Sequence, residues 1–126
     1  MTRLRAASPY VLAAVLAGAG SLHLLRPELF DALVPPILPP CQRAWTYASG
    51  VAELAVATAV AVPATRQRGG LAAAALFLAV FPGNVYMAVE PDDVPRWAAL
   101  ARLPLQVPLV LWGLQVAGKM FSTGRR

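Results

Sequence analysis

The sequence predicts an all-α protein, an integral membrane bundle of four antiparallel helices in a single domain over residues 1–126. The first observation is composition: hydrophobic residues make up 58% of the chain and charged residues 13%. Soluble domains carry about a quarter charged residues, so this chain has too little charge to cover a water-exposed surface. The second observation is pattern, because four apolar runs alternate with short polar or proline-rich connections.

The first predicted helix covers residues 9–25 and is roughly 17 residues long, near the lower limit for crossing a bilayer. Two arginines precede it, and it contains the small-residue stretch AGAGS. A basic start followed by an apolar centre also resembles a secretory signal peptide. The run continues through SLHLL, which favours a spanning helix over a cleaved leader.

The connection at 26–43, RPELFDALVPPILPPCQR, is both apolar and rich in proline. Proline lacks an N–H and restricts the residue before it, so VPPILPP cannot form a regular helix. Two interpretations stay open. The segment is either an interfacial lid over the helix ends or a tight loop tethered by its apolar side chains.

The other three predicted helices cover residues 44–62, 71–89 and 97–117. The turn at 63–70, PATRQRGG, is basic, and the turn at 90–96, EPDDVPR, is largely acidic. Short turns place successive helices side by side and antiparallel.

The basic residues predict the orientation and the location. The net charge is +5, and basic residues without acidic neighbours occur in the N-terminal segment, the 63–70 turn and the C-terminal tail. The positive-inside rule puts these parts, and both termini, in the cytoplasm. Basic residues at the ends of apolar runs indicate topology, so no nucleic-acid partner is predicted. The predicted partner is the lipid bilayer of a bacterial plasma membrane, which the chain crosses several times.

Cysteine and histidine counts exclude several chemistries. Cys41 is the sole cysteine, so the chain has no CxxC motif and no internal disulfide. His23 is the sole histidine, which argues against a protein-held zinc or haem site.

The strongest functional signal is a carboxylate, Glu53, inside an apolar run. An ionisable group at membrane depth is costly and marks a functional site by default. At a rise of about 1.5 Å per residue, Glu53 and Gln106 lie roughly 13 Å below the outer surface, Asn84 and Arg102 roughly 7 Å, and His23 roughly 3 Å. All five fall in the outer half.

Spacing supports one shared site. Ser49 and Glu53 are four residues apart and share a helix face, as do Arg102 and Gln106. Three prolines, Pro82, Pro104 and Pro108, are expected to interrupt the third and fourth helices beside this band. Broken helices are tolerated in membranes where the freed backbone groups find partners or line a cavity.

Two protonation states of Glu53 stay open. A nearby cation favours the charged form, and burial favours the neutral acid. Glu53 is therefore either a carboxylate paired with Arg102 or a neutral acid hydrogen-bonded to Asn84 or Gln106. The neutral acid would be a proton donor or acceptor near neutral pH.

A purely structural interpretation competes with the functional one. Polar residues across membrane helices often serve only as interhelical hydrogen bonds, worth about 0.6 kcal/mol each. His23 alone is typical of an interfacial hydrogen bonder, and Arg102 could extend to the outer surface.

The chain resembles the DoxX-like family of small four-helix membrane proteins. The resemblance rests on GSLHLLRPELF, VPPILPP, SGVAEL, VFPGNVYMAV and RLPLQVPLVLWGL, in that order. The matching positions are His23, Ser49, Gly50, Glu53, Pro82, Asn84, Arg102, Pro104 and Gln106. The resemblance implies varied roles: membrane subunits linked to thiosulfate:quinone oxidoreduction, redox or detoxification proteins and, at a distance, a receptor-assembly chaperone.

Three functions follow as hypotheses. The first is a site for a small apolar molecule, a quinone or a lipid-like compound, with Glu53 and His23 as acid–base residues and Ser49, Asn84, Arg102 and Gln106 as ligand-binding residues. The second is an assembly subunit that binds a membrane-protein partner or another copy of the chain. The third is a proton or solute path, which is disfavoured because Thr58 and Gln115 are the only polar candidates in the inner half.

Overall fold

The computed structural model describes residues 2–31, 34, 39, 41–82, 85, 86 and 96–118. Within these residues the structure is helical and contains no strand, which confirms the all-α prediction. The helices are α1 (Thr2–Leu25), α2 (Glu28–Asp31), α3 (Gln42–Ala61), α4 (Arg66–Ala79) and α6 (Arg96–Val116).

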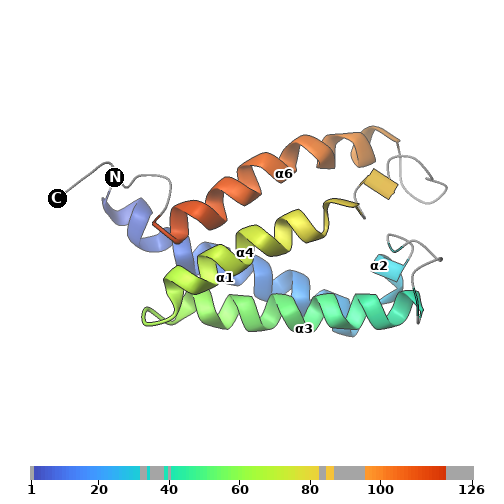
Figure 1. The fold of residues 1–126 in the computed structure, drawn as a ribbon, viewed down its shortest axis with the longest axis horizontal. Coiled ribbons are helices and arrows are strands. Elements are labelled where there is room, and N and C mark those ends of the chain that lie inside the picture. The colour runs from blue at the N-terminus through green and yellow to red at the C-terminus, as the bar shows by residue number, and fades with distance from the viewer. Residues whose placement is uncertain are drawn as a thin grey trace.

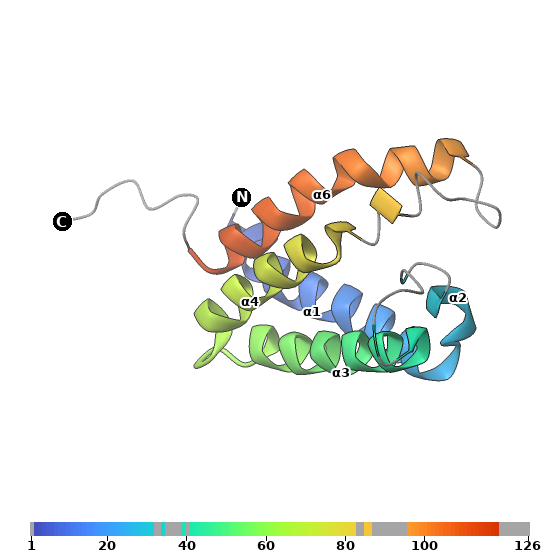
Figure 2. The same ribbon diagram turned by 45° about the vertical axis from the view of Figure 1, so that its right-hand side comes forward.

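The four long helices run alternately up and down (Figure 1). The start of α1, the α3–α4 turn and the end of α6 lie at one end of the bundle, which we call the terminal end. Helix α2 lies at the opposite end, which we call the α2 end (Figures 1 and 2).

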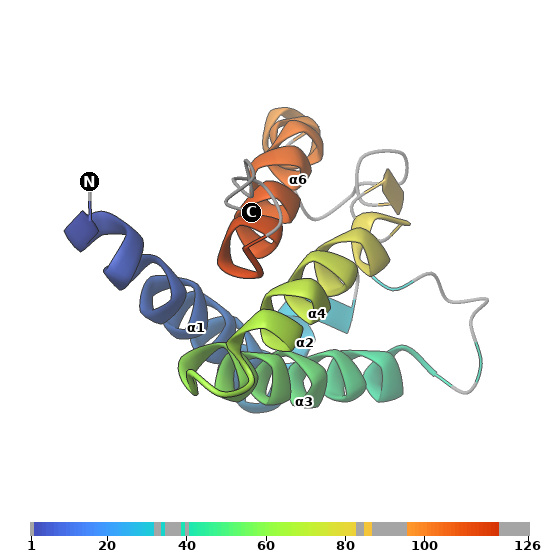
Figure 3. The same ribbon diagram turned by 60° about the vertical axis from the view of Figure 1, so that its left-hand side comes forward.

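The helices pack as two pairs rather than as a closed ring. Helix α1 packs along α3, α4 packs along α6, and α3 joins the pairs through α4. Helix α6 contacts α1 little and stands apart from it in Figure 3. The contact they share is at the terminal end, where Trp112 Nε1 donates to Ser8 Oγ at 3.0 Å and that hydroxyl donates to Gln115 Oε1 at 2.8 Å.

Glycines allow the helices of each pair to approach closely. A Cβ added at Gly50 of α3 would lie 2.8 Å from His23 Cβ of α1, and one at Gly20 would lie 2.8 Å from the carbonyl oxygen of Gly50. The same holds between α4 and α6, where a Cβ at Gly113 would lie 2.7 Å from the Ala74 nitrogen. Small residues at helix crossings are typical of helix packing in membranes.

The main apolar core lies where α1, α3 and α4 meet. Leu12, Leu16 and Val60 are almost completely buried in it, with Ala73 and Phe77 from α4. Between this core and the α2 end, the buried polar side chains Thr46, Glu53 and Gln106 occur among apolar ones.

Several helix boundaries differ from the predictions. Helix α1 begins at Thr2 and includes Pro9, rather than beginning at Pro9. The connection between α3 and α4 is shorter than the predicted turn at 63–70, because α4 begins at Arg66. The Arg66 side chain donates hydrogen bonds to the carbonyl oxygens of Val60 and Ala61, at 2.9 and 3.0 Å, and so satisfies carbonyl groups left free at the end of α3.

The expected proline interruptions differ as well. Helix α6 continues through Pro104 and Pro108, both of which are exposed, so that neither ring is pressed into the interior. The regular part of α4 ends at Ala79, shortly before Pro82. The short helix α2 within the 26–43 connection was not predicted, and VPPILPP falls outside the described residues except for Val34 and Pro39.

Among the described residues, one helix, Arg3–Leu25, is long and apolar enough to cross a membrane, with a mean hydropathy of 1.4 over its best window. Leu100–Val116 is a shorter apolar helix. Signal sequences and buried core helices share these properties, so the prediction of a four-span membrane protein rests on further arguments.

Candidate functional site

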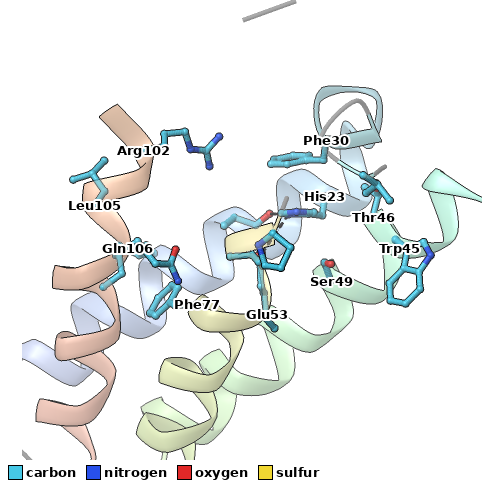
Figure 4. Close-up of a pocket in the computed structure, with 17 residues that line it drawn as sticks. His23, Phe30, Trp45, Thr46, Ser49, Glu53, Phe77, Arg102, Leu105 and Gln106 are labelled. Carbon is cyan, nitrogen blue, oxygen red and sulfur yellow. Dashed lines mark hydrogen bonds and ion pairs between the residues drawn. The ribbon is translucent and has the colours of Figure 1, made fainter. Parts of the chain in front are cut away.

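A cavity of about 570 Å³ opens near the α2 end, with walls from α1, α2, α3, α4 and α6 (Figure 4). Its volume falls within the range of about 300–1,000 Å³ that is typical of small-molecule sites. Most of the lining is apolar. The polar side chains that line it are His23, Thr46, Ser49, Glu53, Arg102 and Gln106.

Five of the six residues predicted for the site therefore line one cavity. They come from three helices: His23 from α1, Ser49 and Glu53 from α3, and Arg102 and Gln106 from α6. The sixth, Asn84, lies outside the described residues.

Glu53 is the most deeply buried acid of the described residues, with 8% of its surface exposed. Its Oε2 atom lies 3.2 Å from His23 Nδ1. That nitrogen is also 2.7 Å from the carbonyl oxygen of Ala19. Because a carbonyl oxygen can only accept, the Nδ1 hydrogen is directed at Ala19, and Glu53 Oε2 makes no hydrogen bond to a described residue.

The close helix crossing explains why these two side chains meet. Gly20 and Gly50 bring the α1 and α3 backbones together beside His23 and Glu53. The imidazole then has a fixed orientation, since it stacks on Phe30 with ring centroids 3.7 Å apart and the planes inclined by 16°. His23 is thus held between its own helix and α2.

Arg102 and Gln106 approach from the other side of the cavity. Gln106 is buried, with 5% exposure, whereas Arg102 is exposed. Figure 4 shows the Arg102 side chain extending from α6 at the level of Phe30, well above Glu53. Of His23 and Arg102, the structure brings His23 into contact with Glu53.

Helix α2 is attached to α3 by an acidic side chain. Asp31 accepts hydrogen bonds from Thr46 Oγ1 at 2.7 Å and from Arg43 Nε at 2.8 Å. Partial burial acts to raise the pKa of Asp31, but these two hydrogen bonds outweigh it and hold the pKa below its usual range. Since α2 carries Phe30, the attachment also positions the ring that stacks on His23.

This attachment predicts an acid-sensitive stability. Because the pKa of Asp31 is lower in the folded state, its carboxylate stabilises the fold above the unfolded-state pKa, and this stabilisation is lost as pH falls through the folded-state pKa. When the pH is lowered from neutral to about 3, we expect the melting temperature of the wild type to fall more than the melting temperature of Asp31→Asn. Thermal unfolding at both pH values measures this.

Glu28→Gln is the matched control. Glu28 pairs with Arg26 at 2.5 Å, but both side chains are more than half exposed, and such pairs contribute little. The fall in melting temperature of Glu28→Gln at acid pH should stay close to that of the wild type. Equal acid sensitivity in the wild type and Asp31→Asn would contradict the role given to Asp31.

The cavity residues that were not predicted from the sequence include Phe30, Thr46 and Phe77. Thr46 precedes Ser49 by three residues and Glu53 by seven, so helical spacing could have identified it. Phe30 belongs to α2, whose position depends on the hydrogen bonds of Asp31. Phe77 is an apolar residue in an apolar helix, so nothing in the sequence distinguishes it from its neighbours. Within the described residues, no group of three His, Cys, Asp or Glu side chains is placed to hold a metal ion.

Comparison with known proteins gives a family but no function. A family model described as a domain of unknown function (DUF8561) matches residues 12–117, which include every described residue lining the cavity. No curated protein and no solved structure matches the chain. Because the match extends over most of the sequence, the chain belongs to the DUF8561 family.

Proposed function

We propose that this protein is a multi-pass membrane protein of the DoxX-like kind, which binds a small apolar molecule, a quinone or a lipid-like compound, in the cavity around Glu53. One observation carries the proposal: a buried carboxylate oxygen without a hydrogen bond to a described residue lies in a largely apolar cavity. A buried polar atom that lacks a partner costs about 1–3 kcal/mol. A ligand that hydrogen-bonds to Glu53 would recover that cost.

Surface composition supports the membrane environment. Large apolar side chains are exposed along all four long helices, as one expects of a surface that faces lipid tails. Examples are Val11, Leu22, Val51, Leu78, Leu105 and Val107. The basic side chains Arg3, Arg5, Arg66 and Arg68 lie toward the terminal end, which we propose faces the cytoplasm of a bacterial cell.

The cavity would then face the outer half of the bilayer. A ligand dissolved in lipid could enter it without crossing a polar surface. Glu53 supplies the acid–base group, and His23 is fixed beside it by Ala19 and Phe30. Gln106 and Ser49 also line the cavity, so their side chains can orient a polar group of the ligand.

The test is ligand retention. Protein extracted gently into nanodiscs is analysed by native mass spectrometry, as the wild type and as Glu53→Gln. We expect the wild type to carry a non-covalent apolar molecule and the variant to carry at least about tenfold less, which corresponds to the loss of one hydrogen bond to a charged group.

Thr58→Ala is the matched control. Thr58 lies on the same helix, is exposed, and donates to the carbonyl oxygen of Leu54 at 2.9 Å, outside the cavity. It should retain ligand like the wild type. If neither the wild type nor the control carries or takes up an apolar molecule, the proposed function is wrong.

A further inference from the structure

We infer that the ligand carries a hydrogen-bond donor, a hydroxyl group on an otherwise apolar molecule such as a hydrophobic phenol or alcohol, and that this hydroxyl binds beside Glu53 and His23. This inference rests on the proposed function and narrows it. Of the two kinds of ligand proposed above, it selects a lipid-like compound that carries a hydroxyl group and disfavours a quinone, whose carbonyl oxygens only accept.

The first step is the direction of the hydrogen bonds already made. His23 Nδ1 is 2.7 Å from the Ala19 carbonyl oxygen, so this nitrogen carries the hydrogen. In the neutral ring, the other nitrogen then has a lone pair and accepts. The imidazole lines the cavity and is 13% exposed, and the nitrogen that the neutral ring has left for a ligand is an acceptor rather than a donor.

The second step is the carboxylate. Glu53 Oε2 lies 3.2 Å from the imidazole and receives no hydrogen bond from a described residue. An ionised carboxylate only accepts. The ring atom that Glu53 faces is Nδ1, whose hydrogen is directed at Ala19, so the ionised Oε2 is a buried acceptor that receives no hydrogen from a described residue until a ligand supplies one.

The third step is the set of donors nearby. The Thr46 hydroxyl is used by Asp31, which it contacts at 2.7 Å. The Arg102 side chain lies near the level of Phe30, well above Glu53 (Figure 4). Gln106 carries both a donor and an acceptor and reaches the cavity from α6, so it can accept or donate to the other side of a hydroxyl.

The last step is discrimination. A hydroxyl donates to Glu53 Oε2, whereas a carbonyl or ether oxygen would set its own lone pairs against this oxygen. Sites built to bond a hydroxyl reject analogues that lack it because their polar groups stay unpaired. The remaining walls are apolar and aromatic, including Phe30, Phe77 and Leu109, which suits a ring or an alkyl chain.

The experiment compares three probes of nearly equal size: para-octylphenol, its methyl ether para-octylanisole, and octylbenzene. Binding to protein in lipid nanodiscs is measured with empty nanodiscs as the reference for partition into lipid. We expect the phenol to bind the wild type about tenfold or more tightly than either of the other two. Octylbenzene has no oxygen, so comparing it with the ether shows whether the ether binds weakly because of its size or because of its oxygen.

Glu53→Gln adds a second measurement. The glutamine side chain has the same shape but carries a donor, so the preference for phenol over the ether should fall to less than about threefold, with the Thr58→Ala control keeping it. The probe comparison in the wild type stands even if the variant folds poorly. Equal binding of phenol and ether would overturn the hydroxyl inference and leave the proposed site intact, whereas no binding of any probe would overturn both.

Discussion

Replacing Glu53 with methionine is expected to raise the melting temperature of the ligand-free protein and to abolish ligand retention. Methionine has a similar length and is unbranched, so it can fill the volume of Glu53. It removes a buried oxygen that has no hydrogen bond to a described residue, an arrangement that costs about 1–3 kcal/mol. The free energy of unfolding should increase by a comparable amount, measured by thermal unfolding in a fixed detergent.

This prediction separates the functional from the structural interpretation of Glu53. A side chain that served only to hold the helices together would destabilise the bundle when removed. Thr58→Met places the same residue on the exposed face of α3 and should change the unfolding free energy by less than about 0.5 kcal/mol. A loss of more than about 1 kcal/mol in Glu53→Met, with no loss in the control, would show that the carboxylate is a structural bond.

Gly50→Ala is expected to destabilise the protein and to disturb the cavity at once. The added Cβ would lie 2.8 Å from His23 Cβ and 3.0 Å from the carbonyl oxygen of Gly20, so α1 and α3 must move apart. Such overpacking costs about 1–3 kcal/mol. The separation also moves His23 away from Glu53, so ligand retention by native mass spectrometry should fall with the melting temperature.

Gly18→Ala is the control for this effect. Gly18 lies on the same helix as Gly20, and a Cβ there would meet nothing within 4 Å. Alanine is the better helix former, so this variant should be unchanged or more stable by roughly 0.5–1 kcal/mol. If Gly50→Ala were as stable as Gly18→Ala, the close contact between α1 and α3 would not exist in the protein.

Most polar residues that line the cavity could be identified from the sequence because polar residues are rare in these helices. In an apolar run, a single Glu53 or Gln106 is conspicuous, and helical spacing shows which residues share its face. Depth along each helix then placed His23, Glu53, Arg102 and Gln106 in the same half of the bundle, and all of them line the cavity. Phe30 and Phe77 could not be found this way, since nothing distinguishes a cavity aromatic from a packed one.

The sequence by itself determined the helical class and most of the polar residues that line the cavity, because composition and period are local properties of the chain. Only the tertiary structure decided which partner Glu53 meets. The sequence left Arg102, Asn84 and Gln106 open, and the structure brings Glu53 against His23, with α1 and α3 held close at Gly20 and Gly50. Tertiary packing also determined that the His23 hydrogen is directed at Ala19, which leaves the carboxylate oxygen without a hydrogen bond to a described residue. Distances between side chains on different helices depend on how closely their backbones approach, and that distance is set by contacts between residues far apart in the chain.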